Sequence, residues 1–506
     1  MRTETELALK TVKEILTEAT YYSNAVHILN FDEETICPPD AMEEQGSIVS
    51  FLGNQAFKLT KQKEFIDAAL LLYNNRDELS EYDRALADSL HRSYKREKKI
   101  TPEKQKQFSD IYNKAFVNWI NAKKNSDFKI FAPSLSDVRD ANLEEIDLEE
   151  KEAGSSAVTS YDDLLDRYER GITEKDLDEA FSECKERLIP LLKKIKSSKK
   201  KIRTDFLSRP VSDEAQKKMA EYLLNTMGFD FNRGAFTTTE HPFTDTLGRN
   251  DERVTTHYYP NMFTSSMFSI IHEGGHALFD QNQPRENFDH FIAEDKTMGM
   301  HESVSRFYEN RIGRSQGFVH LIYDKTCEIF PEAMEGVSER ELYEALNVVE
   351  PSLVRTEADE FTYTFHIIIR YEIEKMIVND KVEIESLPEI WNQKYEEYLG
   401  VRPANDREGI LQDVHWTSGF GYFPTYALGN MYNAMYYNRM KQDIDIESAL
   451  REGHINKIND WMKEHVYKKA AMLTSKEWIK DITGRNFTTE DFLDYLEEKY
   501  GSLYEL

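Results

Sequence analysis

The sequence predicts a mainly α-helical protein with a small β-sheet near its middle. Only 21 glycines and 14 prolines occur in 506 residues, and this scarcity favours helices joined by short connections. Apolar residues recur every three or four positions along segments such as residues 6–31, which is the helical period. Residues 235–259 are instead rich in Thr, Val, Tyr and Phe, which β-strands favour.

Residues 1–125 form an N-terminal subregion of long predicted helices. The opening stretch mixes charged with apolar residues, so it predicts a first helix rather than a signal peptide. The tetrapeptide CPPD at 37–40 interrupts the helical pattern and predicts a loop. Farther along, Thr101 can cap a helix that Pro102 begins, which predicts a boundary between two helices.

A β-hairpin is predicted next to the centre of the chain. Its strands are residues 235–244 and 251–259, and the sequence DTLGRN between them supplies the turn. Residues 264–430 follow as the central core of helices. No linker, repeat or step in composition divides the chain, so we expect one unit over residues 1–506.

Composition excludes several classes of function. Asp and Glu number 92 against 64 Lys and Arg, and a net charge of -28 repels nucleic acid and anionic membranes. No apolar run approaches the roughly 18 residues of a membrane span. The three cysteines are far apart, which predicts reduced thiols in a cytoplasmic protein rather than a disulfide framework.

The stretch SIIHEGGHALFDQ, residues 269–281, carries two histidines four positions apart on a predicted helix. His272 and His276 then project from one face at a spacing that suits a shared metal ion. Glu273 lies about 100° round the helix, beside the metal rather than bound to it, where it can take a proton from an attacking water. An H-E-x-x-H helix therefore predicts a zinc-dependent hydrolase.

Two glycines within this helix need a reason, because each weakens a helix by about 1 kcal/mol relative to alanine. Gly274 and Gly275 lack side chains, which permits close approach of another part of the molecule. That part is either a third ligand or substrate backbone, or simply a neighbouring helix, and the sequence leaves both interpretations open.

A hydrolytic zinc site needs a third protein ligand. The residues that would complete a metzincin motif are absent. Glu302 is preferred, because it stands on a downstream helix whose apolar face can hold it rigidly. Asp280 and Glu294 are the alternatives, and His301 is expected to support the ligands from behind.

Six spaced motifs lie along most of the chain: HPF at 241–243, DERVT at 251–255, HEGGH at 272–276, HES at 301–303, VRTEAD at 354–359 and GILQDVHW at 409–416. Together they resemble the signature blocks of the carboxypeptidase Taq family of metallocarboxypeptidases. Phe31 and Cys37 depart from the family, where Trp and Met are expected.

The resemblance implies a saddle-like, mostly helical fold with a deep groove, and a homodimer. It also implies removal of single residues from peptide C-termini with broad specificity. The metal is usually zinc, one ion per subunit, and cobalt can often replace it. By this resemblance His272, His276 and Glu302 are the metal ligands and Glu273 is the general base.

Peptide hydrolysis creates an oxyanion that needs hydrogen-bond donors besides the metal. His415 in QDVHW is one candidate, and Tyr426 in GYFPTY is preferred to Tyr422 as the second. Ordinary core packing is an equally good interpretation of each tyrosine, since the chain has 27 of them.

A carboxypeptidase also needs a cation for the terminal carboxylate, and arginine pairs with carboxylate bidentately. Arg355 is the first candidate, following the family, and Arg253 is the second; the structural alternative for Arg355 is an ion pair with Asp359. His241 is expected to line the groove. The strand that begins at Arg253 is expected to offer an exposed edge to an extended substrate.

These residues predict a metallocarboxypeptidase that acts on peptides with broad specificity, with residues 264–430 as its catalytic core. An oligopeptidase that cuts internal bonds with the same metal core is the alternative enzyme. A peptide-binding protein without activity is the third interpretation, and the intact His-Glu-His set argues against it.

Overall fold

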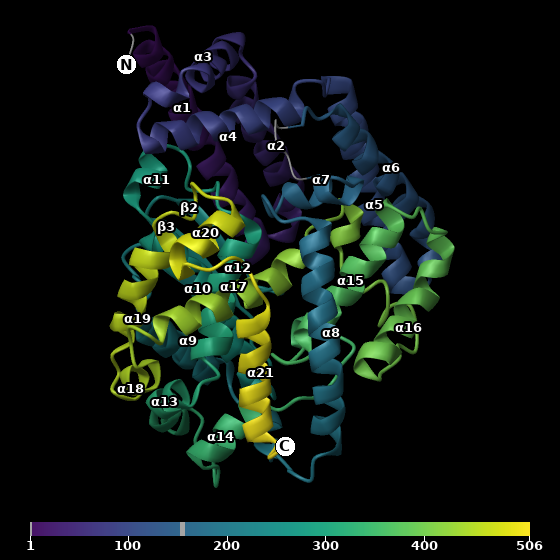
Figure 1. Cartoon of the computed structure of the whole chain (residues 1–506), viewed down its shortest axis with the longest axis vertical. Coiled ribbons are helices and arrows are strands. Elements are labelled where there is room, and N and C mark those ends of the chain that lie inside the picture. The colour runs from purple at the N-terminus through teal and green to yellow at the C-terminus, as the bar shows by residue number, and fades with distance from the viewer. Residues whose placement is uncertain (1–2, 152–156) are drawn as a thin grey trace.

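The computed structural model describes residues 3–151 and 157–506 and shows a mainly α-helical protein, as predicted (Figure 1). Its α-helices are α1 (Thr3–Thr35), α2 (Met42–Thr60), α3 (Lys63–Asn74), α4 (Glu81–Glu97), α5 (Pro102–Asn125), α6 (Ala132–Leu148), α7 (Ser160–Asp166), α8 (Glu174–Ser197), α9 (Asp213–Met227), α10 (Phe263–Asn282), α11 (Arg285–Asp289), α12 (Met298–Arg306), α13 (Gln316–Ile329), α14 (Glu339–Leu346), α15 (Tyr363–Val378), α16 (Leu387–Leu399), α17 (Pro424–Met440), α18 (Ile446–Arg451), α19 (Ile455–Met462), α20 (Ser475–Thr483) and α21 (Glu490–Leu503). The boundary predicted near Thr101 is confirmed, because the Thr101 side chain accepts a hydrogen bond from the Lys104 N–H at the start of α5.

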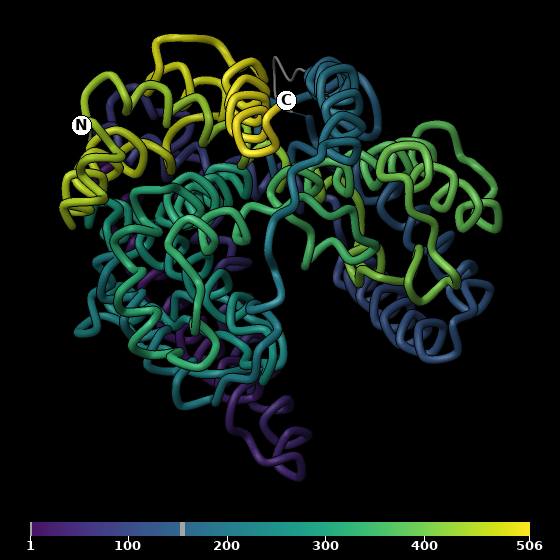
Figure 2. Tube along the Cα trace, turned by 90° about the horizontal axis from the view of Figure 1, so that it is seen from below, coloured from purple at the N-terminus to yellow at the C-terminus, as the bar shows by residue number. Residues whose placement is uncertain are grey.

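The helices gather into two lobes that give the molecule a saddle-like outline (Figure 2). One lobe holds α9 to α14 together with α18 and α19, and the other holds α5, α6, α15 and α16. Helices α8 and α21 run side by side between the lobes, although they are far apart in the sequence. The fold class that the sequence predicts is therefore confirmed.

Two apolar cores hold the chain together. The larger one draws buried residues from α5 onwards through α21. A second core joins α1, α3 and α4, where Val12, Leu72 and Leu86 are almost fully buried, and it reaches Ile292 and Ala471 of the main body. Helix α5 belongs to the main core, so the apolar packing of the N-terminal region changes between α4 and α5 rather than at residue 125. The prediction that the chain acts as one unit stays a prediction.

The small sheet has three strands, β1 (Gly234–Thr238), β2 (Thr244–Gly248) and β3 (Asp251–Thr256), in the order β1-β3-β2. Strands β2 and β3 form the hairpin, with pairs such as Thr244 with Val254. Strand β1 pairs with β3 in parallel.

The prediction of one hairpin from residues 235–244 and 251–259 is thus wrong in its first strand, because much of the expected turn is β2. The expected exposed edge is also wrong, because β3 is the central strand and both of its edges are paired. The sheet lies against α10 through β3 and β2.

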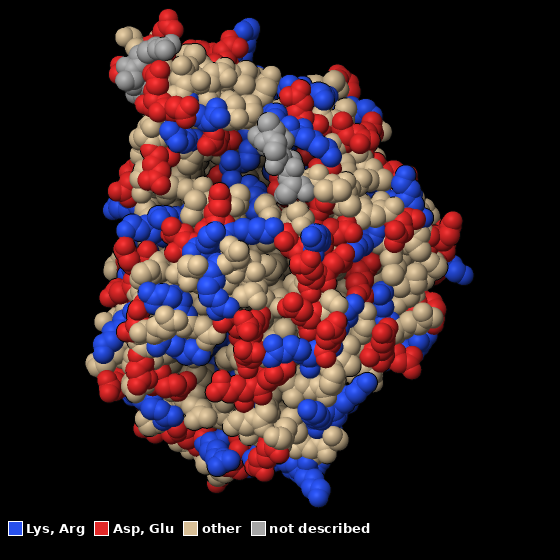
Figure 3. Space-filling model, in the orientation of Figure 1, with Lys and Arg blue, Asp and Glu red and all other residues tan. Residues whose placement is uncertain are grey.

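The surface carries charged side chains of both signs (Figure 3). On the face seen in Figure 3, acidic and basic side chains are interspersed over most helices. Within residues 3–151 and 157–506, none of the helices combines the length and the apolar character that crossing a bilayer requires.

Candidate functional site

Three predicted metal ligands meet where α10 packs on α12. The Nε2 atoms of His272 and His276 lie 3.6 Å and 3.4 Å from Oε2 of Glu302. In a tetrahedral zinc site with bonds of about 2.0–2.1 Å, neighbouring ligand atoms are about 3.3 Å apart, so this donor set fits such an ion. The two imidazoles are 18% and 14% exposed, which leaves the site open on one side for water or substrate.

Close packing of helices brings Glu302 to the histidines. A Cβ atom on Gly275 of α10 would lie 2.8 Å from the Ser305 Cα of α12, and one on Gly429 of α17 would lie 2.9 Å from the Glu302 Cγ. A Cβ on Gly274 would instead meet side chains of α9, chiefly that of Leu224. The sequence left open whether the glycines admit a third ligand or a neighbouring helix. At Gly275 both apply, because the helix that approaches is α12, which carries the candidate ligand Glu302.

A second set of charged groups orients two of these side chains, His272 and Glu302. His272 Nδ1 lies 2.8 Å from the Glu309 Oε2, which favours the proton on Nδ1 and leaves Nε2 free to bind a cation. Arg306 Nε donates to the Glu302 Oε1 at 2.7 Å, and its Nη1 donates to the Glu309 Oε2 at 3.1 Å. Burial disfavours the charged form of Glu302, but Arg306 and His272 outweigh it and hold the pKa of that carboxyl well below its usual range.

The alternative third ligands have other partners. Asp280 Oδ2 lies 2.8 Å from the His301 Nε2, and its Oδ1 forms a 3.1 Å ion pair with Lys296. The Glu294 side chain is largely exposed and pairs with the same lysine. His301 lies behind the site, as expected, with its ring 4.3 Å from that of His276. Among the described residues, His272, His276 and Glu302 form the one cluster able to hold a metal ion.

Glu273 follows the predicted ligand His272 on α10 and is held by the sheet. Its side chain is buried beside the triad, and its Oε2 accepts a 2.8 Å hydrogen bond from the Thr244 hydroxyl at the start of β2. Burial raises the pKa of Glu273 above its ordinary value. The sheet thus fixes the rotamer of this glutamate.

A second charged cluster lies next to the triad and contains Arg355, which begins the 3₁₀ turn η6 (Arg355–Glu357). The Arg355 Nη2 and Nε donate to the Asp413 Oδ1 at 2.9 Å and 3.1 Å. Arg370 of α15 donates to the other oxygen of Asp413 at 2.7 Å. Two buried guanidinium groups therefore share one carboxylate, which leaves one positive charge in excess.

Tyr363 connects this cluster with the metal ligands. Its hydroxyl accepts a 3.1 Å hydrogen bond from Arg355, and its ring lies 3.9 Å from the guanidinium carbon of Arg306. Because Arg306 also binds Glu302, two residues, Tyr363 and Arg306, separate Arg355 from a candidate ligand of the predicted metal site. The excess positive charge therefore lies close to where a metal would act.

His415 and the two candidate tyrosines are brought together on one side of this cluster. His415 lies in the 3₁₀ turn η8 (His415–Thr417), and its Nε2 lies 3.4 Å from the Tyr426 hydroxyl. The Tyr422 ring stacks on the imidazole at 5.5 Å and meets the Tyr426 ring edge-on at 5.3 Å. Burial, with the charges of Arg355 and Arg370, lowers the pKa of His415 to about 4. The imidazole is therefore neutral at pH 7.

Three other predicted residues have different surroundings. Arg253 forms an ion pair with Asp251 on its own strand and lies over the Phe31 ring. His241 is exposed in the connection between β1 and β2. Asp359 is not the partner of Arg355; it accepts the Phe361 and Thr362 N–H groups before α15 instead.

Sequence analysis missed Glu309, Arg306, Thr244, Tyr363 and Arg370. The first two carry a usable signal, because positions 302, 306 and 309 share one face of a helix. The π-helical segment η5 (Phe307–Ile312) continues α12 and carries Glu309. The other three meet the site from separate elements, so no local spacing identifies them.

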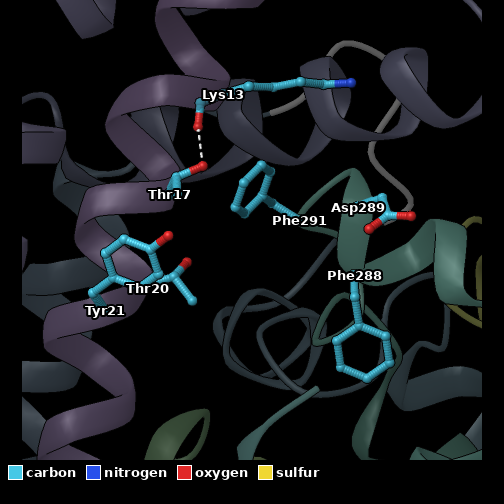
Figure 4. A pocket seen from close by; sticks show the side chains of 7 residues that line it. All are labelled: Lys13, Thr17, Thr20, Tyr21, Phe288, Asp289 and Phe291. Carbon is cyan, nitrogen blue, oxygen red and sulfur yellow. Dashed lines mark hydrogen bonds between the residues drawn. The ribbon is translucent and has the colours of Figure 1, made fainter. Parts of the chain in front are cut away.

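A shallow hollow of about 350 Å³ lies elsewhere, between α1 and the segment around α11 (Figure 4). In Figure 4 the Thr17 hydroxyl bonds the Lys13 carbonyl, and the aromatic rings are spread around the rim rather than stacked. None of the predicted site residues lines it. Its lining residues are Lys13, Thr17, Thr20, Tyr21, Phe288, Asp289 and Phe291.

Comparison with known proteins gives the same result as the geometry. Residues 11–500 match the Carboxypeptidase Taq (M32) metallopeptidase family. The chain belongs to this family. It is 39% identical over 498 residues to Carboxypeptidase 1 of Bacillus subtilis, covering 97% of this chain and 98% of that one.

Other M32 relatives agree over the full length. The chain is 32% identical to Thermostable carboxypeptidase 1 of Thermus thermophilus, covering 99% of both. The crystal structure of the M32 carboxypeptidase from Deinococcus radiodurans R1 superposes with a TM-score of 0.93 at 29% identity, covering 100% of both chains. The predicted family and enzyme class are confirmed: the chain is an M32 metallocarboxypeptidase, a hydrolase whose chemistry requires a metal ion.

Proposed function

We propose that this M32 peptidase removes the last residue of peptides by clamping their terminal carboxylate on Arg355, with broad tolerance of side chains. One observation carries the proposal: Arg355 and Arg370 share only Asp413, and two residues separate this excess buried positive charge from Glu302. Buried charges need partners, and a substrate carboxylate supplies the missing one. Recognition through this carboxylate reads no side chain, which supports broad specificity.

His272, His276 and Glu302 would hold the metal, and their nitrogen and oxygen donors suit zinc, with cobalt as a substitute. A divalent cation there supplies Lewis-acid polarisation and makes a water molecule more acidic. Glu273 takes the proton of the attacking water and later delivers it to the leaving amine. Its bond from Thr244 keeps the carboxylate turned toward the site.

His415 and Tyr426 donate hydrogen bonds to the carbonyl oxygen as negative charge develops on it. A neutral imidazole suits this role, because one of its nitrogens carries a proton while the other remains an acceptor. Tyr422 stacks on His415 and lines the substrate side of the same cluster. Arg253 and His241 are kept as candidates for contact with more distant residues of the peptide.

We also propose a homodimer and a cytoplasmic location for the enzyme. The dimer rests on the resemblance to the family. The location is supported by three free cysteines, of which Cys37 and Cys184 are buried.

Paired peptide substrates test the function. Metal-loaded protein is incubated with a free-acid peptide and with its C-terminal amide, and the products are resolved by mass spectrometry. We expect single residues to be released in sequence, chiefly from the free acid. Equal cleavage of both forms or internal cuts would establish the oligopeptidase, and no cleavage of either would support a binding protein.

A variant of Arg355 tests whether this residue is what distinguishes free-acid peptides from their amides. Arg355→Lys keeps the positive charge but loses the paired donors, so we expect KM for the free acid to rise while turnover of the amide stays the same. An unchanged ratio of acid to amide cleavage would exclude Arg355 as the clamp.

A further inference from the structure

The segment that carries His415 and Tyr422 is attached to α15 at two separate points. Arg370 binds Asp413 just before His415. One turn farther along α15, Glu374 binds the segment that follows. Residues four apart lie on the same face of a helix, so one face of α15 supports both.

Glu374 is a buried carboxylate with three hydrogen-bond donors. Its Oε1 accepts from the Trp416 Nε1 at 2.9 Å. Its Oε2 accepts from the Gly421 N–H at 3.0 Å and from the Tyr161 hydroxyl of α7 at 2.7 Å. Among the described residues, no lysine or arginine forms an ion pair with Glu374. The carboxylate thus joins the residue after His415 to the residue before Tyr422.

The backbone around Gly421 is pressed against α7. Gly421 has φ +93°, and a Cβ atom there would lie 2.9 Å from the carbonyl carbon of Leu164. Tyr161, which also bonds Glu374, lies one turn earlier on the same helix. The segment is therefore held between α7 and α15, and Glu374 is where the two attachments meet.

Burying such a carboxylate without a contacting cation is unfavourable, and burial raises the pKa of Glu374 to about 7. A neutral hydrophobic residue would fill the space without this penalty. A carboxylate has what a hydrophobic residue lacks, namely two acceptor oxygens at a fixed angle for donors from different parts of a segment.

We propose that Glu374 is a positioning residue that sets His415 and Tyr422 for transition-state stabilisation, while Arg370 separately sets the Arg355–Asp413 clamp. The assignment rests on the proposed function, because it gives the oxyanion donors and the clamp of that site different supporting residues on one face of α15. Loss of Glu374 lowers kcat, since the oxyanion donors act in the transition state, and it leaves KM for the free acid near its original value.

The variant Glu374→Gln tests the assignment. Glutamine keeps one acceptor oxygen but places an NH₂ group against a donor, either Trp416 or the Gly421 and Tyr161 pair. A displacement of the segment by about 1 Å predicts a roughly 10- to 100-fold lower kcat. KM and the ratio of acid to amide cleavage are expected to stay within about twofold of the wild type.

Glu372→Gln is the matched control on the same helix. Glu372 also has three donors, Lys185, Lys394 and Tyr398, but they come from α8 and α16. We expect this variant to lower the melting temperature without changing kcat or KM. Equal losses of kcat in both variants would reduce Glu374 to a structural role and overturn the proposal.

A double variant adds a measurement, the recovery of kcat, that is not expected if Glu374 has a purely structural role. Trp416→Phe removes the donor that faces Oε1, so it relieves the clash created in Glu374→Gln. The double variant Glu374→Gln/Trp416→Phe is expected to recover part of the lost kcat, and a further loss in proportion to both single variants would count against the proposal.

Wild-type behaviour separates this test from that of the function. A wild type that cleaves acid and amide equally would refute the clamp, yet the effect of Glu374→Gln on kcat would still decide the positioning role. An unchanged kcat in a folded, metal-loaded Glu374→Gln protein would overturn it.

Discussion

The predicted metal site and the proposed carboxylate clamp adjoin each other but are built differently. The predicted ligands stand on α10 and α12, two helices in glycine-mediated contact. The residues of the proposed clamp stand in η6, in the segment before η8, and on α15, where buried ion pairs hold them. Helix packing positions the residues of the metal half, and buried ion pairs position those of the clamp half.

This difference predicts how each half responds to damage. Packing of α10 on α12 rests on the close approach at Gly275, so we expect the metal half to keep its shape when the cation is removed. The clamp half contains two buried arginines, so we expect it to depend on its anion.

Glu273→Gln should lower kcat by roughly 10²- to 10⁴-fold, because the amide cannot accept a proton from water. Metal content should not change, since Glu273 is beside the predicted ligands. Steady-state kinetics and metal analysis of the purified protein measure both. Glu294→Gln, which changes an exposed acid paired with Lys296, is the control and should behave as the wild type; turnover retained in Glu273→Gln would refute its role as base.

Asp413→Asn should destabilise the protein by about 3–5 kcal/mol, because it leaves two buried guanidinium groups without their anion. Removal of the metal by a chelator should have a smaller effect on the urea midpoint. Circular dichroism during urea unfolding measures both. The exposed Asp494, a partner of Arg187, gives the control variant Asp494→Asn, which should be neutral. If the wild type without metal were less stable than Asp413→Asn, the metal half, and not the clamp half, would depend more on its charged partner.

Gly275→Ala should cost about 1–3 kcal/mol and weaken metal binding, because its methyl group meets the α12 backbone. Gly274→Ala meets mainly the end of the Leu224 side chain, which can move, so its effect should be smaller. Thermal melting and zinc titration of both variants test the pair. Equal effects would show that α12 is not held through Gly275.

His415 should not titrate between pH 5 and 8, because its pKa is lowered to about 4. Since the folded pKa lies below the unfolded value of about 6.5, this histidine contributes stability that is complete above pH 6.5 and is lost as pH falls toward 4. Imidazole nitrogen shifts measured by NMR follow the titration directly. A transition near pH 6.5 would mean that the His415 imidazole is open to water.

The metal half was largely predictable because its signals are local. Two histidines and a glutamate at fixed helical spacing define a face of one helix, and Glu302 stands on the next suitable one. The predicted hairpin was displaced for a related reason: the composition of 235–259 identifies strands, but pairing partners depend on contacts with the rest of the chain. Asp359 was a plausible partner of Arg355 by helical spacing, and the actual partner, Asp413, lies 58 residues away.

By itself, the sequence determined a mainly helical fold, and its spaced motifs resemble the carboxypeptidase Taq family. It also predicted that His272 and His276 share one face of a helix with Glu273 beside them, because helical periodicity converts short spacings into faces. Only the tertiary structure decided which charges meet: Asp413 between Arg355 and Arg370, Thr244 on Glu273, and Glu374 beneath the segment of His415. These contacts join elements far apart in the chain, and burial selects them through the free energy of unpaired charges rather than through any repeating pattern of residues.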